Sequence, residues 1–156
     1  MPNHCHNRVT IYGSGNDTEE TREQIAKLKE IFEGESIFTH FIPEPDWPKT
    51  PVTLGHEMRY GTTRAKIGEL PLPDGTFKST GLRDDRWYDW RLQNWDTKWD
   101  AYEVSIDDDD PDQLEVSFET AWCPPDAICH AMREQYPDLS VSWFYDEPGC
   151  EIAGYL

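Results

Sequence analysis

The chain has 156 residues with 31 acidic and 14 basic side chains, which gives a formal net charge of −17 at neutral pH. Such a charge disfavours direct binding to DNA or RNA, because nucleic-acid-binding proteins carry basic surfaces. The length favours one domain with its own core, and no apolar run approaches the roughly 20 residues of a membrane-spanning helix. The polar first residues lack a signal-peptide profile, so we expect a soluble cytoplasmic protein without a membrane partner.

The first elements are a strand and a helix. Residues 8–12 alternate between polar and apolar side chains and are followed by Gly13-Ser14-Gly15, which predicts a short strand and a turn. Asp17 and Glu20 form a pattern similar to a capping box, and Gly34 can end the helix that follows. The apolar stripe of this helix comprises Ile25, Leu28, Ile31 and Phe32.

The middle of the chain, residues 35–100, is less regular. Ser36–Ile42 has the composition of a strand, but four prolines between residues 43 and 51 forbid regular structure there. Residues 86–99 are rich in aromatic side chains and predict a short helix. A stretch this long inside a domain indicates an insertion, which we expect to pack back onto the domain through its tryptophans.

The last third contains two strands, a helix and a further strand. Residues 101–106 and 114–122 alternate in polarity and flank an acidic loop at residues 107–112, so we predict a hairpin. Pro124 and Pro125 suit the first turn of a helix that Pro137 ends. Residues 139–145 then form a strand, and residues 151–155 can add a short final one.

The order of these elements predicts the fold. Strand, helix, two strands, helix and strand correspond to an α+β fold of the ferredoxin-like class, a split β-α-β-β-α-β arrangement. We therefore expect one antiparallel sheet with two helices on one face and a long irregular insertion after the first helix. The prediction is a single ferredoxin-like domain over residues 1–156, with residues 35–100 as an insertion packed onto it.

Negative charge is concentrated in the last third of the chain. Residues 101–156 contain 14 acidic side chains and one basic side chain, Arg133. Two interpretations fit: a charge that only keeps the protein soluble, or an ordered acidic surface that binds a basic protein. The residues predicted to form this surface are Glu103, Asp107, Asp108, Asp109, Asp110, Asp112, Glu115 and Glu119.

Metal and catalytic motifs are weak. His4 and His6 would share one face of a strand, but no second pair of ligands follows at a spacing typical of zinc sites. Residues 107–110 lack the central glycine and closing acid of a calcium-binding EF-hand loop. The four cysteines form no Cys-x-x-Cys pair, so we expect reduced and mostly buried thiols. We predict no catalytic residue, metal or cofactor.

Six of the seven tryptophans lie between residues 87 and 143. Large aromatic side chains bury where they can, so we expect an aromatic core in which Trp95, Trp99 and Trp122 are mostly buried. The alternative is a binding cleft between the insertion and the sheet, in which Asp100 and Glu119 supply carboxylates. The residues of that cleft would be Asn94, Trp95, Lys98, Trp99 and Trp122.

Four sequence blocks together resemble a known family. They are Met1-Pro2-Asn3 with Cys5 and Asn7, residues 94–102 (NWDTKWDAY), residues 118–125 (FETAWCPP), and residues 145–149 (YDEPG) with Ala153-Gly154. They are similar to the YubB-like family of plasmid and phage proteins, which has an assigned ferredoxin-like domain and no assigned function. That family usually has glycine at the position of Asp96. The resemblance implies the fold and a mobile-element setting, and it transfers no catalytic residue.

Two functional hypotheses follow. The first is a non-enzymatic protein of a mobile genetic element that binds a basic partner, such as a host nuclease or DNA-binding protein, and so inhibits a host defence by charge mimicry. The second is a small-molecule-binding or enzymatic domain that uses the tryptophan-lined cleft.

Overall fold

The structure, a computed structural model, describes residues 3–15, 18–50, 68–79, 81, 83–107 and 109–156. It divides into two compact units, of which the first comprises Met1–Glu44 and Arg91–Leu156 and the second Pro45–Trp90. Residues 35–44 and 91–100, which the sequence assigned to the insertion, therefore belong to the first unit. The packing of the insertion onto the domain stays a prediction.

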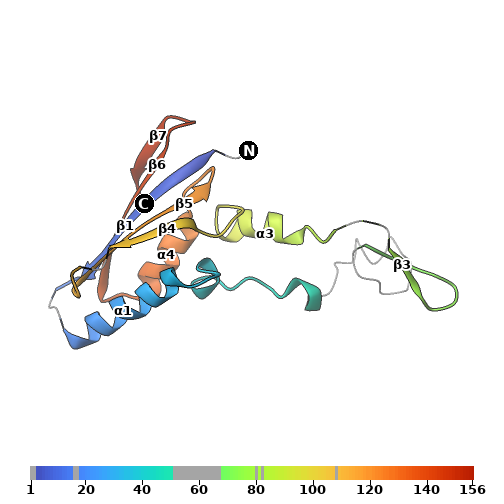
Figure 1. Cartoon of the computed structure of the whole chain (residues 1–156), viewed down its shortest axis with the longest axis horizontal. Helices are drawn as coiled ribbons and strands as arrows, with labels where there is room; N and C mark the ends of the chain where they lie inside the picture. Colours follow the sequence, from blue (N-terminus) through green and yellow to red (C-terminus); the bar gives the residue numbers. More distant parts are fainter. Residues whose placement is uncertain (1–2, 16–17, 51–67, 80, 82, 108) are drawn as a thin grey trace. The chain divides into compact units, whose positions relative to one another are not determined.

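The first unit is built on a five-stranded antiparallel sheet with the strand order β4-β5-β1-β6-β7 (Figure 1). The strands are β1 His4–Gly13, β4 Tyr102–Asp107, β5 Gln113–Ala121, β6 Leu139–Glu147 and β7 Ile152–Tyr155. The predicted hairpin with its acidic loop is the β4–β5 pair. β1 begins earlier than the alternation from residue 8 indicated, and it lies at the centre of the sheet.

Two helices, α1 Glu19–Glu33 and α4 Asp126–Gln135, lie on the same side of this sheet (Figure 1). The capping box of α1 is formed by Thr18 and Thr21, whose hydroxyls accept each other's backbone N–H groups. The N-cap is therefore Thr18, whereas Asp17, which the sequence suggested together with Glu20, lies outside the described residues. Threonine at both positions gives the same reciprocal hydrogen bonds that the box requires. The α+β class is confirmed.

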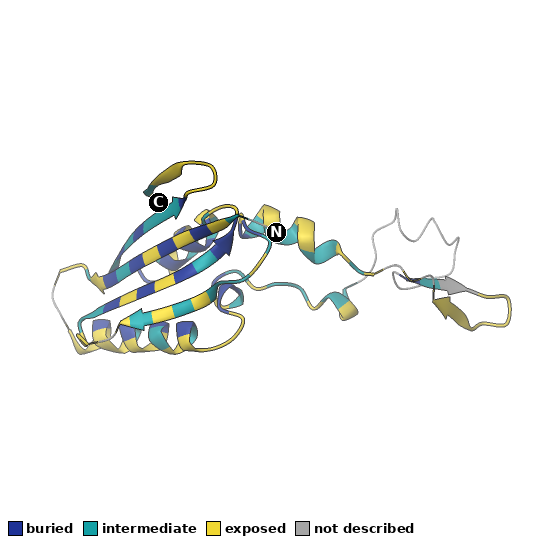
Figure 2. Cartoon of the chain, turned by 45° about the horizontal axis from the view of Figure 1, so that its top comes forward, coloured by how far each residue is buried: buried dark blue, intermediate teal, exposed yellow. Residues whose placement is uncertain are grey.

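Residues of the sheet alternate between buried and exposed, which leaves the face opposite the helices open (Figure 2). On β1, for example, Cys5, Asn7 and Val9 are buried towards the helices, whereas His6 and Arg8 are exposed. This period of two follows from the pleat of a strand. The open face is therefore lined by polar side chains in register across neighbouring strands.

The core lies between the sheet and the two helices, with Phe118 at its centre. Its ring contacts those of Phe32, Phe38 and Trp143 at centroid distances of 5.9, 6.1 and 5.6 Å. The buried amide of Asn7 donates to Thr120 and accepts from the Trp143 indole, so these polar groups are satisfied inside the core. The aliphatic core residues include Val9, Ile11, Ile25, Leu28, Leu114, Val116, Ile128 and Val141.

The segment at Ser36–Ile42 is not a strand. It contains the short 3₁₀ helix η1, Phe38–His40, whose Phe38 side chain is buried. The backbone N–H of Phe38 donates to the carboxylate of Asp100 at 3.0 Å, which fixes the turn. The prediction failed because alternation over a few residues cannot distinguish a short strand from a turn with two inward side chains.

The second unit contains the short 3₁₀ helix η2, Trp47–Lys49, and the strands β2 Glu69–Pro71 and β3 Phe77–Ser79. The two strands pair with each other as a two-stranded sheet. Within it, the Arg86 guanidinium lies 5.3 Å from the ring centroid of Trp47, and Trp47 contacts Trp90 at 6.3 Å. The predicted aromatic helix is α3, Arg86–Asn94, which is shorter than the predicted range 86–99. Across the described residues, no helix is long and apolar enough to cross a membrane.

Candidate functional site

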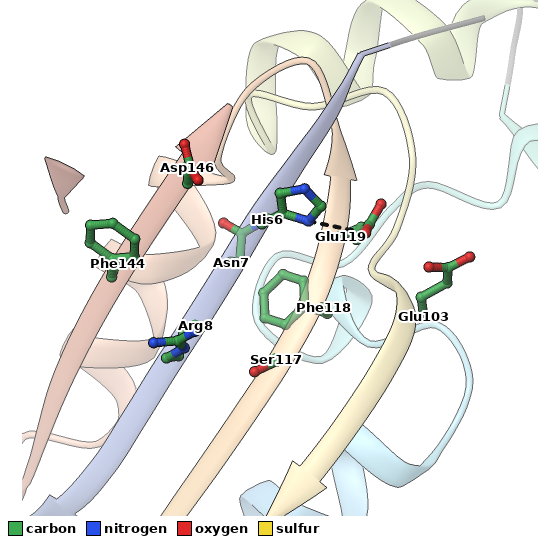
Figure 3. Close-up of a pocket in the computed structure, with 9 residues that line it drawn as sticks. All are labelled: His6, Asn7, Arg8, Glu103, Ser117, Phe118, Glu119, Phe144 and Asp146. Carbon is green, nitrogen blue, oxygen red and sulfur yellow. Dashed lines mark ion pairs between the residues drawn. The ribbon is translucent and has the colours of Figure 1, made fainter. Parts of the chain in front are cut away.

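The open, polar face of the sheet carries a shallow cavity of about 380 Å³ (Figure 3). Strand register explains its composition, because His6 on β1 lies opposite Glu119 on β5 and Asp146 on β6. Two residues further along β1, Arg8 lies opposite Ser117 on β5 and Phe144 on β6. The cavity is lined by His6, Asn7, Arg8, Glu103, Ser117, Phe118, Glu119, Phe144 and Asp146.

At one end of this face, the carboxylate of Glu119 lies between two histidines. Its two oxygens are each 3.0 Å from an imidazole Nδ1, one of His4 and one of His6. The His4 Nδ1 also lies 2.6 Å from the hydroxyl of Tyr102 on β4. Partial burial, together with the Glu119 charge, raises the pKa of that tyrosine. His4 and His6 thus converge as predicted, and Glu119 is already engaged within the protein.

Glu103 lies beside this cluster in an unusual backbone conformation. The pairing of β4 with β5 shifts between Tyr102 and Ser105, and Glu103 within this irregularity has a φ of 51°. Left-handed backbone is uncommon for a residue other than glycine, and a bulge re-aims the side chains next to it. Glu103 is exposed and lines the same cavity as His6 and Glu119 (Figure 3).

The acidic hairpin loop is only partly free. Asp107, Asp109 and Asp110 are exposed, and Asp108 lies outside the described residues. Asp112, by contrast, accepts a bidentate hydrogen bond from the Arg22 guanidinium of α1 at 2.6 and 3.0 Å, which lowers its pKa. No lysine or arginine lies close to the loop in the sequence, which suggested that none of its carboxylates has a basic partner. The fold shows otherwise for Asp112, because Arg22 of α1 forms an ion pair with it.

The predicted tryptophan cluster does not form one cleft wall. Trp95 is fully buried against Phe38, and its indole N–H donates to a backbone carbonyl, so no ligand can reach its ring. Trp99 and Trp122 are 37% and 45% exposed, which contradicts the expectation that both are mostly buried. Lys98 covers the Trp99 ring at 4.5 Å, an intramolecular cation–π contact. Asn94 is half-buried at the end of α3.

Asp100, the carboxylate proposed for that cleft, has a structural role. One of its oxygens accepts the backbone N–H groups of Phe38 and Ala101 at 3.0 and 2.8 Å. Burial nevertheless raises the pKa of Asp100, because desolvation of the charged form outweighs these hydrogen bonds.

The cysteines are all free thiols, but they are not activated nucleophiles. Burial raises the pKa of both Cys5 and Cys129 to about 11, so their thiolate forms are scarce at neutral pH. The pKa values of Cys123 and Cys150 are also raised, although these two side chains are exposed rather than buried as expected. For Cys150 the cause is its hydrogen bond to the Glu147 carboxylate.

No group of three or more His, Cys, Asp and Glu side chains in the described part of the chain is arranged to hold a metal ion. Among the described residues, the charged and titratable groups on this polar face include carboxylates, the imidazoles of His4 and His6, and the guanidinium of Arg8. Sequence reasoning identified Glu103 and Glu119 on this face but missed Arg8, Phe144 and Asp146. Only the strand register reveals them, because β1 pairs with both β5 and β6 and is distant in sequence from them.

Residues 94–156 match the family described as "Ferredoxin-like domain in Api92-like protein". This segment includes β4, β5, α4, β6 and β7, so the predicted ferredoxin-like class is confirmed for it. A search of curated proteins found no match.

A similar solved structure is the crystal structure of protein api92 from Yersinia pseudotuberculosis. The two chains are 12% identical, the alignment covers 99% of this chain and 93% of that chain, and the TM-score is 0.51. At this identity the likeness shows the fold alone. The plasmid and phage setting implied by the YubB-like resemblance stays a prediction.

Proposed function

We propose that this protein is a non-enzymatic interaction protein that binds a basic partner through the acidic surface of its β4–β5 hairpin. The partner class is a basic nucleic-acid-binding protein, such as a nuclease or DNA-binding protein of a host. Binding would cover the partner's basic surface by imitating the charge of a nucleic acid. The mobile-element setting, in which such an inhibitor acts against a host defence, rests on the YubB-like resemblance.

The observation that supports this function is a set of hairpin carboxylates that have no lysine or arginine partner among the described residues. In the part of the chain that the structure describes, none of them forms an ion pair with a lysine or arginine. Closely spaced like charges are unfavourable for folding by a few tenths of a kcal/mol each, and a basic partner would relieve this repulsion. The residues of this set are Glu103, Asp107, Asp109, Asp110 and Glu115.

The arrangement of the sheet supports the finer fold assignment on which the proposal rests. The order β4-β5-β1-β6, with α1 and α4 on one side, is that of a split β-α-β-β-α-β unit to which β7 is added. Residues 45–90 then correspond to an insertion between α1 and β4. In this arrangement the hairpin and the open face are continuous, so a partner can contact both.

Competition with DNA tests the proposal. The probe is a fluorescent arginine-rich peptide bound to a short DNA duplex, and the protein is added as a competitor. The measurement is made at about 20 mM and at about 300 mM salt, because the Debye length falls from roughly 20 to roughly 6 Å between these two conditions. We expect the protein to displace the peptide from DNA, with the direct protein–peptide affinity falling steeply as salt increases. Failure to bind the free peptide even at low salt would rule out the function.

A matched pair of variants localises the effect. Replacing Asp107, Asp109 and Asp110 by Asn removes three charges from the hairpin, whereas replacing Glu19, Glu20 and Glu23 by Gln removes three from the start of α1. The hairpin variant should associate with the peptide about tenfold more slowly at low salt. The α1 variant should change association much less. Equal rates for the two variants would show that only net charge matters.

A further inference from the structure

A groove runs between the exposed edge of β4 and the end of α1. It has a volume of about 670 Å³ and lies within the first unit. Its walls come from two segments, the C-terminal end of α1 with the turn that follows it, and the backbone and side chains of β4. The lining includes Phe32, Glu35, Ile37, Glu103, Val104 and Ile106.

The floor of the groove is apolar. Phe32 and Ile37 are buried beneath it, and Val104 and Ile106 of β4 are half-buried on the helix side of the sheet. These two β4 side chains lie at the outermost position of the sheet, so one flank of each has no neighbouring strand to cover it.

The rim of the groove is acidic. Glu35 and Glu103 are exposed, and none of the described residues that line the groove is a lysine or arginine. On the open face of the same strand, Asp107 is also exposed and lies beyond Ser105. β4 thus presents carboxylates on one side and aliphatic side chains on the other, with a period of two.

β4 is also an edge strand. It pairs with β5 on one side, and in the described part of the chain no strand pairs with its other side. From Ser105 to Asp107 its register with β5 is regular, after the irregularity at Glu103. An unpaired edge offers backbone N–H and C=O groups that can hydrogen-bond to another strand.

We infer that the basic partner docks by adding an extended segment of its own chain to the edge of β4. This mode, β-strand addition, gives affinity through backbone hydrogen bonds and specificity through alternate side chains. The segment would have alternating apolar and basic residues. The apolar ones would pack on Val104 and Ile106, and the basic ones would face Glu103 and Asp107. The inference rests on the proposed function for the basic character of the partner and adds the place and the mode of docking.

Two other interpretations of this edge are tested against the proposal. In the first, Glu103 and the bulge only protect the edge strand from pairing, as charged residues and bulges do in other sheets. A second copy of this chain could occupy the edge, with two β4 strands side by side. Charge argues against the second copy, because each copy would place Glu103 and Asp107 against the same carboxylates of the other.

The test uses two synthetic peptides with the sequence Lys-Val-Arg-Val-Lys-Val-Arg. One has a normal backbone, and the other is N-methylated at alternate residues, which removes hydrogen-bond donors along one side but keeps the charge. Fluorescence anisotropy at low salt gives their affinities for the full chain. Amide hydrogen exchange by NMR reports which backbone groups become protected.

We expect methylation to weaken binding at least tenfold and the normal peptide to slow exchange at Val104 to Asp107. Glu103→Gln should weaken binding about threefold, with Glu151→Gln as a control of equal charge in the β6–β7 turn. Equal affinity for the two peptides, or no protection in β4, would overturn the inference but leave the proposed function intact. Absence of binding by either peptide at low salt would overturn both. A concentration-dependent dimer with protected β4 amides in the free protein would assign the edge to a second copy instead.

Discussion

The carboxylate of Asp96 accepts a hydrogen bond from the backbone N–H of Ala127 at 2.9 Å, which caps α4 from a distant loop. The residue that precedes this helix, Pro125, has no side chain able to do so. Asp96 also has a left-handed backbone, with a φ of 64°. The position thus combines a conformation that favours glycine with a hydrogen bond that glycine cannot make.

We expect Asp96→Ala to be the most destabilising change at this position. It loses the cap and keeps a strained backbone, so the free energy of unfolding should fall by about 1–3 kcal/mol. Asp96→Gly loses the cap but relieves the strain, and Asp96→Asn keeps an acceptor and tolerates the conformation, so both should cost roughly 1 kcal/mol or less. Urea unfolding measures the series. Equal losses for Ala and Gly would show that backbone strain contributes nothing.

The Arg22–Asp112 pair should make stability depend on pH. Because the hydrogen bond from Arg22 lowers the pKa of Asp112 in the folded state, its contribution is present above the unfolded pKa of about 3.9 and is lost as pH falls through the folded value. Arg22→Gln should therefore be less stable than the wild type near neutral pH, and the difference should vanish in acid. NMR titration of Asp112 should show its pKa rising to the ordinary range in the variant. An unchanged pKa would mean that the pair is absent in solution.

Gly149 should tolerate no side chain. A Cβ at this position would lie 2.7 Å from a Glu147 carboxylate oxygen and would also clash with the Asn3 amide. Glu147 is fully buried and accepts the backbone N–H groups of Gly149 and Cys150, so it cannot move away easily. Gly149→Ala should lower the free energy of unfolding by roughly 1–3 kcal/mol, the usual range for overpacking. Gly15→Ala is the control, because its position is open, and it should cost much less.

The tryptophans should differ from one another in their effect on stability. Trp95→Ala removes a fully buried side chain and should cost about 3–5 kcal/mol. Trp99→Ala and Trp122→Ala remove side chains that are 37% and 45% exposed, and each should cost roughly half as much or less. Chemical denaturation of the three variants checks the order. A loss of similar size in all three would restore the aromatic core that the sequence predicted.

The thiols should fall into two classes. Cys123 and Cys150 are exposed and should react with a thiol reagent in the native protein, more slowly than free cysteine because their pKa values are raised. Cys5 and Cys129 are buried and should react only after unfolding. The absorbance change with the reagent should correspond to two thiols per chain before denaturant is added and to four thiols afterwards. Stoichiometric zinc in the purified protein by elemental analysis would contradict the expectation of metal-free thiols.

The sequence by itself determined which segments form the main strands and helices. The sequence shows the alternation of polarity in β5 and β6 and the apolar stripe of α1, because these patterns depend only on residues that are close together along the chain. Proline and glycine positions likewise marked the start of α4 and the end of α1. The concentration of acidic side chains after residue 100 needed only counting.

The tertiary structure decided which side chains meet. Arg22 neutralises Asp112 across 90 residues, and Glu119 is held between His4 and His6, although nothing in the local sequence indicates either contact. The register of β1 with β5 and β6 sets these pairs, and a shift of one residue would turn every side chain to the other face. Strand order also placed β4 at the edge, where its apolar and acidic sides border a groove. Long-range pairing is a property of the whole fold, so the groove could not be predicted from the sequence of the hairpin alone.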